Sequence, residues 1–239
     1  IYLINDPFQV LYAHDSYFPK DGVQYVGVNK DYTSTENLIR KYPQYHYDSY
    51  IFGSSRSMYY LTAEWSKHIN SDRCYHFDAY AESLYGIERK FQFLYDRGIK
   101  INNALIILDM EACEGVADKN YSKKKHPKLT GQNPIAFQLR CMQKYFEATF
   151  LSQYITFLVT RKVESGMYNT LLNEISTHYD EITNELTFPV LENAISSNRD
   201  SFYQARQKIF YKQSEKEVIR KETLGPKQIE LFNNIKRIL

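Results

Sequence analysis

Short apolar runs and amphipathic segments alternate through the first half of the chain. Residues 47–52 and 73–77 have the aromatic-rich pattern of short core strands, and residues 104–108 form an aliphatic run typical of a parallel strand buried on both faces. Residues 83–97 repeat apolar side chains at spacings of three and four, which predicts a helix ending before Gly98. Because the segment after the first strand can also continue as a helix, the order predicts an α/β fold with a doubly wound parallel sheet.

The rest of the chain has a weaker pattern. Residues 1–46 are rich in Asp, Asn, Pro and Tyr and predict an irregular lead-in, apart from a strand-like run at 23–28. Residues 47–239 are expected to form a single α/β domain. Within it, residues 135–158 predict one helix, and residues 226–239 predict a final helix with proline near its first position.

The sequence Gly53-Ser54-Ser55 directly follows the first apolar run. A strand that breaks at glycine and leads into a helix presents hydroxyl groups at its carboxyl end, beside the first backbone N–H groups of that helix. This arrangement suits a serine nucleophile, because hydrogen-bond donors stand where an oxyanion forms. The alternative is that Ser54 or Ser55 only caps the helix.

Polar residues follow all three predicted strands. Ser54 and Ser55 follow the first, Asp78 the second and Asp109 the third. Ligands of doubly wound proteins bind off the carboxyl ends of the strands, so these side chains are expected to share one rim of the sheet. A role in capping the turn after its strand suits Asp109 equally well.

Composition narrows the classes of function. The net charge of +2 gives no strong field for nucleic acid, and no nucleic-acid partner is expected. The basic run 123–126 is expected to be a solvated loop, with contact to an anionic substrate or lipid headgroup as the alternative. Three scattered cysteines have no zinc-site spacing, and neither a metal nor another cofactor is predicted. The 22 tyrosines suit sugar binding.

Several blocks together resemble the SGNH hydrolase superfamily, and more narrowly a bacterial branch related to the D-alanine transfer proteins of cell-wall polymer modification. The first block is residues 48–57, the second 79–87 and the third 105–109, and residues 126–129 also look like that branch. The resemblance covers residues 45–160. It implies a flavodoxin-like sheet of the SGNH-hydrolase type.

The resemblance also implies roles for individual residues. Ser55 stands where the superfamily's Gly-Asp-Ser signature has its nucleophile, and Ser54 replaces the aspartate. The backbone N–H of Ser55 is expected to contribute to the oxyanion hole, with a further donor from the loop 78–81. The residues expected to serve the oxyanion or the substrate are Gly53, Ser54, Arg56, Asp78, Ala79 and Asp109.

Two features depart from the family pattern. Asp109 stands where the superfamily has an asparagine that donates a hydrogen bond, which an ionised carboxylate cannot do. No Asp-x-x-His block closes the chain, and none of the six histidines stands where the general base is expected. Because the chain also stops on what looks like a crossover helix, we expect it to be truncated at both ends, with a C-terminal strand and the base missing. A degenerate, non-catalytic relative is the alternative.

By this resemblance the chain is expected to be an extracytoplasmic serine esterase or O-acyltransferase that acts through an acyl-Ser55 intermediate. Its partners would be an acylated glycan, cell-wall or lipid-linked polymer, and a membrane-bound O-acyltransferase. It is expected at the periplasmic or extracellular face of the cell membrane. No apolar run in this sequence is long enough to span a membrane, so the expected anchor would lie before Ile1. The alternatives are a non-catalytic glycan-binding or assembly module, and a phosphate-handling enzyme that uses residues 53–56 as an anion cradle.

Overall fold

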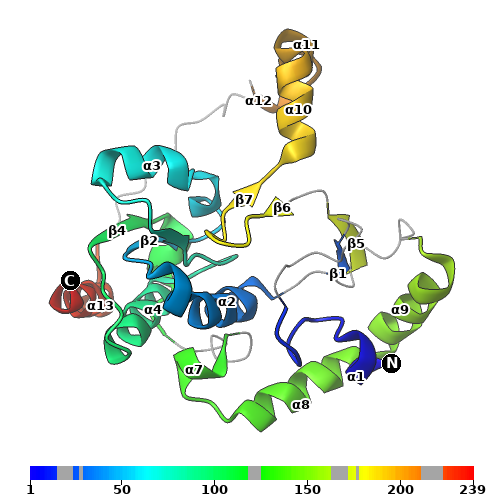
Figure 1. Cartoon of the computed structure of the whole chain (residues 1–239), viewed down its shortest axis with the longest axis horizontal. Helices are drawn as coiled ribbons and strands as arrows, with labels where there is room; N and C mark the ends of the chain where they lie inside the picture. Colours follow the sequence, from blue (N-terminus) through cyan, green and yellow to red (C-terminus); the bar gives the residue numbers. More distant parts are fainter. Residues whose placement is uncertain (15–23, 27–28, 118–124, 163–171, 176–177, 211–222) are drawn as a thin grey trace.

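The strand that leads to Gly53 lies at the centre of a parallel sheet. The computed structural model describes the chain except residues 15–23, 27–28, 118–124, 163–171, 176–177 and 211–222. Three parallel strands pair in the order β3-β2-β4 and are flanked by helices, as Figure 1 shows. This confirms the predicted α/β class, and the order is consistent with a flavodoxin-like sheet. The strands are β2 (Ser49–Gly53), β3 (Cys74–His76) and β4 (Asn103–Ile107).

The register aligns the carboxyl ends of the three strands. Ser49 lies opposite both Cys74 and Asn103, and Gly53 lies opposite Ile107. In the described part of the chain β4 pairs only with β2, and all five of its residues are partly exposed. The prediction that 104–108 is buried on both faces is therefore wrong, because this aliphatic run occupies an edge of the sheet.

Helix α4 (Leu84–Asp96) covers one face of the sheet, as its periodicity predicted. The hydroxyl of Ser83 caps it by accepting a hydrogen bond from the backbone N–H of Gly86 at 3.0 Å. Its apolar stripe is fully buried, and the ring of Phe91 stacks on Phe52 of β2 at 4.2 Å. The predicted final helix is also confirmed as α13 (Pro226–Ile238), which packs against α4 through Leu231 and Ile235.

Helix α2 (Lys30–Tyr45) corrects the prediction of an irregular segment over residues 1–46. Its buried side chains are mostly polar or charged and include Lys30 and Asp31, whereas Leu38 is its one fully buried aliphatic residue. Because the inner face is polar, no apolar stripe marks this helix in the sequence. The lead-in also contains α1 (Tyr2–Asn5) and β1 (Gln24–Val26), the latter paired antiparallel with β5 (Leu172–Ile175).

The helix predicted over 135–158 is two helices. The first, α8 (Pro134–Tyr145), ends at Phe146, and the second, α9 (Ala148–Thr160), begins after Glu147, whose backbone is extended. No glycine or proline marks this break in the sequence. The remaining elements are η1 (Ser57–Tyr59), α3 (Thr62–Ile69), α5 (Met110–Glu114), α7 (Pro127–Thr130), β6 (His178–Tyr179), β7 (Leu186–Thr187), α10 (Pro189–Ser197), α11 (Arg199–Ala205) and α12 (Gln207–Phe210).

None of the helices in the described ranges combines the length and the apolar character that a membrane span requires.

The end of the basic run is buried rather than solvated, which corrects the prediction for Lys125 and His126; Lys123 and Lys124 lie outside the described residues. Nδ1 of His126 accepts the backbone N–H of Lys128 at 3.1 Å and caps α7. Nε2 lies 2.8 Å from a carboxylate oxygen of Glu36. Since Nδ1 accepts, the hydrogen is on Nε2 and the ring is neutral.

We expect this neutral histidine to make the protein less stable as the pH falls below neutrality. Burial, the largest cause, lowers the pKa of His126, although Glu36 acts in the opposite direction. The pKa in the unfolded chain stays near its usual value of about 6.5, so below that pH the unfolded state takes up a proton that the folded state does not. This contribution is therefore fully present above about pH 6.5 and is lost as the pH falls towards the folded pKa.

Urea unfolding at about pH 7.5 and about pH 5.5 checks the expectation. His126→Gln should reduce the difference in midpoint between the two pH values, whereas the exposed His68→Gln should leave it as in the wild type. A pH dependence that His126→Gln does not change would contradict it.

Candidate functional site

The chain turns sharply at Gly53, where β2 ends. The φ angle of Gly53 is +153°, and a Cβ atom there would lie 2.7 Å from the carbonyl oxygen of Ile107 and 2.8 Å from Cβ of Ser57. Only glycine therefore allows β2 to approach both β4 and the following turn so closely. The turn leads into the single 3₁₀ turn η1, and α3 begins only at Thr62. The continuous helix expected directly after the serines is absent.

The two serines of the turn have different surroundings. Ser54 is 6% exposed, and its hydroxyl donates a hydrogen bond to Oδ2 of Asp109 at 2.5 Å. Ser55 is exposed, and its hydroxyl has no hydrogen-bond partner among the described residues. Neither side chain caps η1 or α3, which sets aside the capping alternative. Of the two hydroxyls, that of Ser55 is the one that lies at the surface.

Asp109 joins the ends of β2 and β4. Oδ1 accepts the backbone N–H of Ala112 at 2.8 Å and caps α5, so the capping role considered for Asp109 is confirmed. Oδ2 accepts the hydrogen bond from the Ser54 hydroxyl and lies 3.2 Å from a guanidinium nitrogen of Arg56. The hydrogen bond from Ser54 is the main cause of the lowered pKa of Asp109, followed by the Ala112 N–H. The ionised carboxylate therefore holds the turn and has no hydrogen to give to an oxyanion.

Asp78 and Ala79 lie beneath the turn and not on the open rim. Asp78 is fully buried, with Oδ1 2.5 Å from Nζ of Lys30 and Oδ2 3.0 Å from the hydroxyl of Ser57. Burial alone would raise the pKa of Asp78, but the charges of Lys30 and His76 outweigh it and lower the pKa. The backbone N–H of Ala79 donates to the carbonyl of Gly53 at 3.2 Å, so this donor already serves the fold.

His76 is buried between two acceptors. Its Nδ1 lies 2.9 Å from Oδ2 of Asp78, and its Nε2 lies 2.8 Å from the carbonyl oxygen of Tyr60. Since both partners accept, both ring nitrogens carry hydrogens in this arrangement. His76 therefore has no lone pair to offer as a base for Ser55. His76 is the last residue of β3 and Asp78 lies two residues further on. This spacing at the end of the run 73–77 was readable in the sequence.

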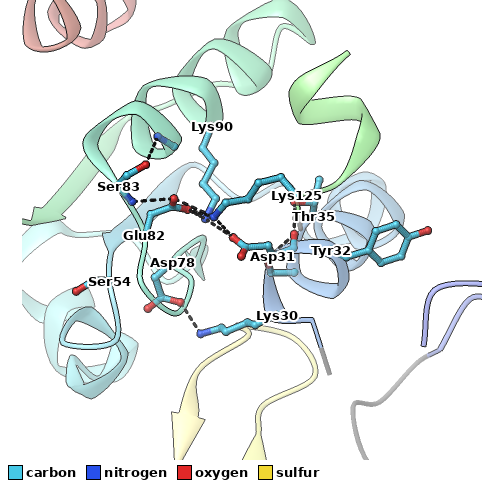
Figure 2. A network of polar contacts seen from close by, with 12 residues as sticks. Lys30, Asp31, Tyr32, Thr35, Ser54, Asp78, Glu82, Ser83, Lys90 and Lys125 are labelled. Atoms are coloured by element: carbon cyan, nitrogen blue, oxygen red, sulfur yellow. Dashed lines mark hydrogen bonds and ion pairs between the residues drawn. The ribbon is translucent and has the colours of Figure 1, made fainter. Parts of the chain in front are cut away.

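A second set of buried charges lies next to the ion pair of Asp78 and Lys30 (Figure 2). Glu82 pairs with two lysines: Nζ of Lys90 lies 2.5 Å from one carboxylate oxygen, and Nζ of Lys125 donates to the two oxygens at 2.9 Å and 3.0 Å. Lys125 also contacts Asp31. Burial raises the pKa of Asp31. Burial would also raise the pKa of Glu82, but Lys125 and Lys90 outweigh it and lower that pKa. We call the following six residues the buried charge cluster: Lys30, Asp31, Asp78, Glu82, Lys90 and Lys125.

In the buried charge cluster three lysines face three carboxylates, and His76, with hydrogens on both ring nitrogens, lies beside Asp78 as a further cation. Unpaired charges at such depth would cost several kcal/mol each, so the pairing stabilises the packing of α2 and α4 on the sheet. The cluster brings together segments that no sequence motif connects. It lies below the Ser55 turn and gives that turn a rigid base through the contacts of Asp78 with Lys30 and Ser57.

None of the six histidines, all of which are described, hydrogen-bonds to Ser55. His14 contacts Asp6, and His76 and His126 are buried in the contacts given above. The others are exposed, namely His46, His68 and His178. Over the described ranges, no group of three or more His, Cys, Asp or Glu side chains is arranged to hold a metal ion.

Comparison of the chain with protein-family models, with curated proteins and with solved structures gave no match. The resemblance to the SGNH hydrolases stays a prediction from the sequence motifs.

Proposed function

We propose that the protein is a serine esterase or O-acyltransferase in which Ser55 is the nucleophile. The observation that carries the proposal is the exposure of Ser55 at the carboxyl end of the central strand, in a turn fixed by Gly53 and by the Ser54–Asp109 hydrogen bond. Ligand sites of parallel α/β sheets lie at this edge. A reactive group benefits from such a support, because its position is set by buried neighbours.

Backbone donors for an oxyanion are present in the same turn. The N–H groups of Ser55 and Arg56 donate to no acceptor within the described residues, whereas that of Ser57 is bound to the carbonyl of Ser54 at 3.1 Å. An oxyanion that forms beside Ser55 would meet these two donors. They take the place of the loop donor expected from Ala79.

The proposed reaction proceeds in two steps. The Ser55 hydroxyl adds to the acyl carbonyl and gives its proton to a base. The tetrahedral intermediate then collapses to acyl-Ser55, and the base returns the proton to the oxygen of the departing alcohol. A sugar hydroxyl or water then attacks the acyl-serine and restores the free hydroxyl. The base has to reach Ser55 from its exposed side, because both nitrogens of the buried His76 are occupied.

The substrate we propose is a cell-envelope polysaccharide or a lipid-linked polymer at the outer face of a bacterial cell membrane. The sequence resemblance supports this substrate and location, with a membrane-bound O-acyltransferase as acyl-donating partner. The guanidinium of Arg56 is two-thirds exposed while it contacts Asp109. It is therefore placed to bind an anionic group of such a polymer beside Ser55.

Labelling with a fluorophosphonate probe tests the nucleophile. Wild-type protein should be labelled, and Ser55→Ala should lose the label. Ser54→Ala keeps the Ser55 hydroxyl and should still be labelled, but more slowly, because the turn loses its hydrogen bond to Asp109. A wild type that does not react, or a Ser55→Ala variant that labels equally, would show that Ser55 is not a nucleophile.

A non-catalytic glycan-binding module is the second candidate. It is favoured by the lack of a histidine at Ser55 and by exposed tyrosines on segments next to the turn, which are Tyr59 and Tyr60 at η1 and Tyr80 after Asp78. Their rings offer flat apolar faces for sugar rings. Glycan binding that survives Ser55→Ala, in a protein that the probe does not label, would support this candidate over the enzyme.

A further inference from the structure

Helix α8 has a second apolar face that nothing in the described structure covers. Its inner face packs Phe137 against Tyr32, with ring centroids 5.1 Å apart, and Tyr145 against Tyr2 at 5.0 Å. On the opposite side four large apolar residues are 38–70% exposed, and their spacings of four, three and four align them along the helix. We call these the α8 stripe: Ile135, Leu139, Met142 and Phe146.

The neighbouring helices add to this exposed apolar surface. Ile155 and Val159 of α9 are exposed one turn apart, and Leu3 and Ile4 are exposed on α1, which contacts α8 through the Tyr2–Tyr145 pair. In Figure 1 these three helices gather at one end of the molecule, away from α3 and the sheet. Single exposed apolar residues are common, but an aligned set marks an interaction surface.

The stretch from α7 to just beyond α9 carries an excess of positive charge, with Arg140 and Lys144 inside α8 and the other cations on the segments that flank α8 and α9. Residues 126–162 contain five lysines and arginines and one acidic residue, a formal charge of +4, while the whole chain has +2. Counted in the same way, the remainder of the chain is therefore at −2. Four of the cations are exposed, and Lys144 is the one that pairs with the single acid, Glu147, at 2.5 Å. The exposed cations are Lys128, Lys144, Arg161 and Lys162.

We propose that α8 and α9 rest on the surface of an anionic membrane. The α8 stripe enters the boundary between headgroups and acyl chains, and the flanking lysines and arginines contact the lipid phosphates. A helix with a line of Ile, Leu, Met and Phe on one side and cations beside it has the features of an interfacial helix. An apolar protein partner would need the α8 stripe but not the positive charge. The positive charge therefore favours an anionic lipid surface over a protein partner. The inference does not depend on Ser55.

Flotation of the full chain with lipid vesicles tests the proposal. The protein should float with vesicles of equal parts phosphatidylglycerol and phosphatidylcholine, and much less with pure phosphatidylcholine. Replacing two stripe residues, Leu139→Gln with Phe146→Gln, should weaken binding by about ten-fold or more, since each exchange removes an apolar side chain from the interface. Lys128→Gln with Lys162→Gln should weaken binding to the anionic vesicles only.

The control variant carries Val190→Gln and Leu191→Gln on α10, which are similarly exposed but lie outside the positively charged stretch 126–162. It should bind as the wild type does. Unfolding midpoints check that the stripe variant stays folded, since its changes are at the surface. The proposal is overturned if the wild type does not float, or if the stripe variant binds like the wild type. It is also overturned if the stripe variant converts a dimer to a monomer without changing flotation, since the stripe is then an interface between two copies.

Discussion

Replacing Asp78 by asparagine is expected to lower the free energy of unfolding by about 3–5 kcal/mol. The substitution preserves the shape of the side chain but removes the charge that Lys30 meets at 2.5 Å and His76 at 2.9 Å. All three side chains are buried, so water cannot replace the lost carboxylate. Urea unfolding at neutral pH, with the midpoint and the slope fitted together, measures the loss.

Two further variants separate charge pairing from a general effect of mutation. Glu64→Gln breaks the exposed pair of Glu64 with Lys67 and should leave the midpoint unchanged within error. Lys30→Met combined with Asp78→Asn removes the unpaired cation, so the double variant should lose clearly less stability than the two single losses summed. Additive losses would contradict the pairing of Lys30 with Asp78.

Glu82→Gln is the second change with a large expected effect. Glu82 is the carboxylate that Lys90 and Lys125 share, and its replacement leaves Asp31 as the nearest acid for two buried lysines. Lys90 has no exposure through which it could become hydrated. We expect a loss of about 3–5 kcal/mol in the free energy of unfolding.

The matched control for Glu82 lies on α4. Glu88 is also buried, but among the described residues its side chain accepts a hydrogen bond from the neutral amide of Asn234 at 3.4 Å. Glu88→Gln keeps a polar group and breaks no ion pair among the described residues, so its loss of stability should be well below half that of Glu82→Gln. If the two variants lose the same stability, the lysines do not depend on Glu82. Thermal unfolding followed by circular dichroism provides the comparison.

The elements with an apolar face were predictable from the sequence. The spacing of apolar residues and the positions of glycine or proline correctly predicted four elements, which are β2, β3, α4 and α13. Helix α2 was missed, because the residues that it buries include Lys30 and Asp31, and a search for apolar stripes passes over them. The break at Phe146 was also missed, since no residue there disfavours a helix strongly.

For the candidate site, the sequence indicated the positions but not their exposure. The roles of Gly53 and Asp109 were predictable from their neighbours in the sequence. Gly53 has a backbone angle that favours glycine, and Asp109 directly precedes a helix that it caps. The division between a buried Ser54 and an exposed Ser55 depends on Asp109, which is far along the chain. Likewise, the burial of Asp78 depends on Lys30, which comes from the helix that lacks a sequence signal. Long-range partners of this kind have no local pattern.

The polar inner face of α2 also affects the order in which the protein folds. Lys30 precedes Asp78 by 48 residues, and Asp31 precedes Lys125 by 94 residues. During synthesis from the N-terminus, α2 is therefore complete long before the charges that neutralise it exist. Docking α2 on a partly made sheet would bury lysine and aspartate without partners, which costs more than the contacts return. We therefore expect α2 to dock on the sheet only after residue 125 has been added, as a long-range step of folding.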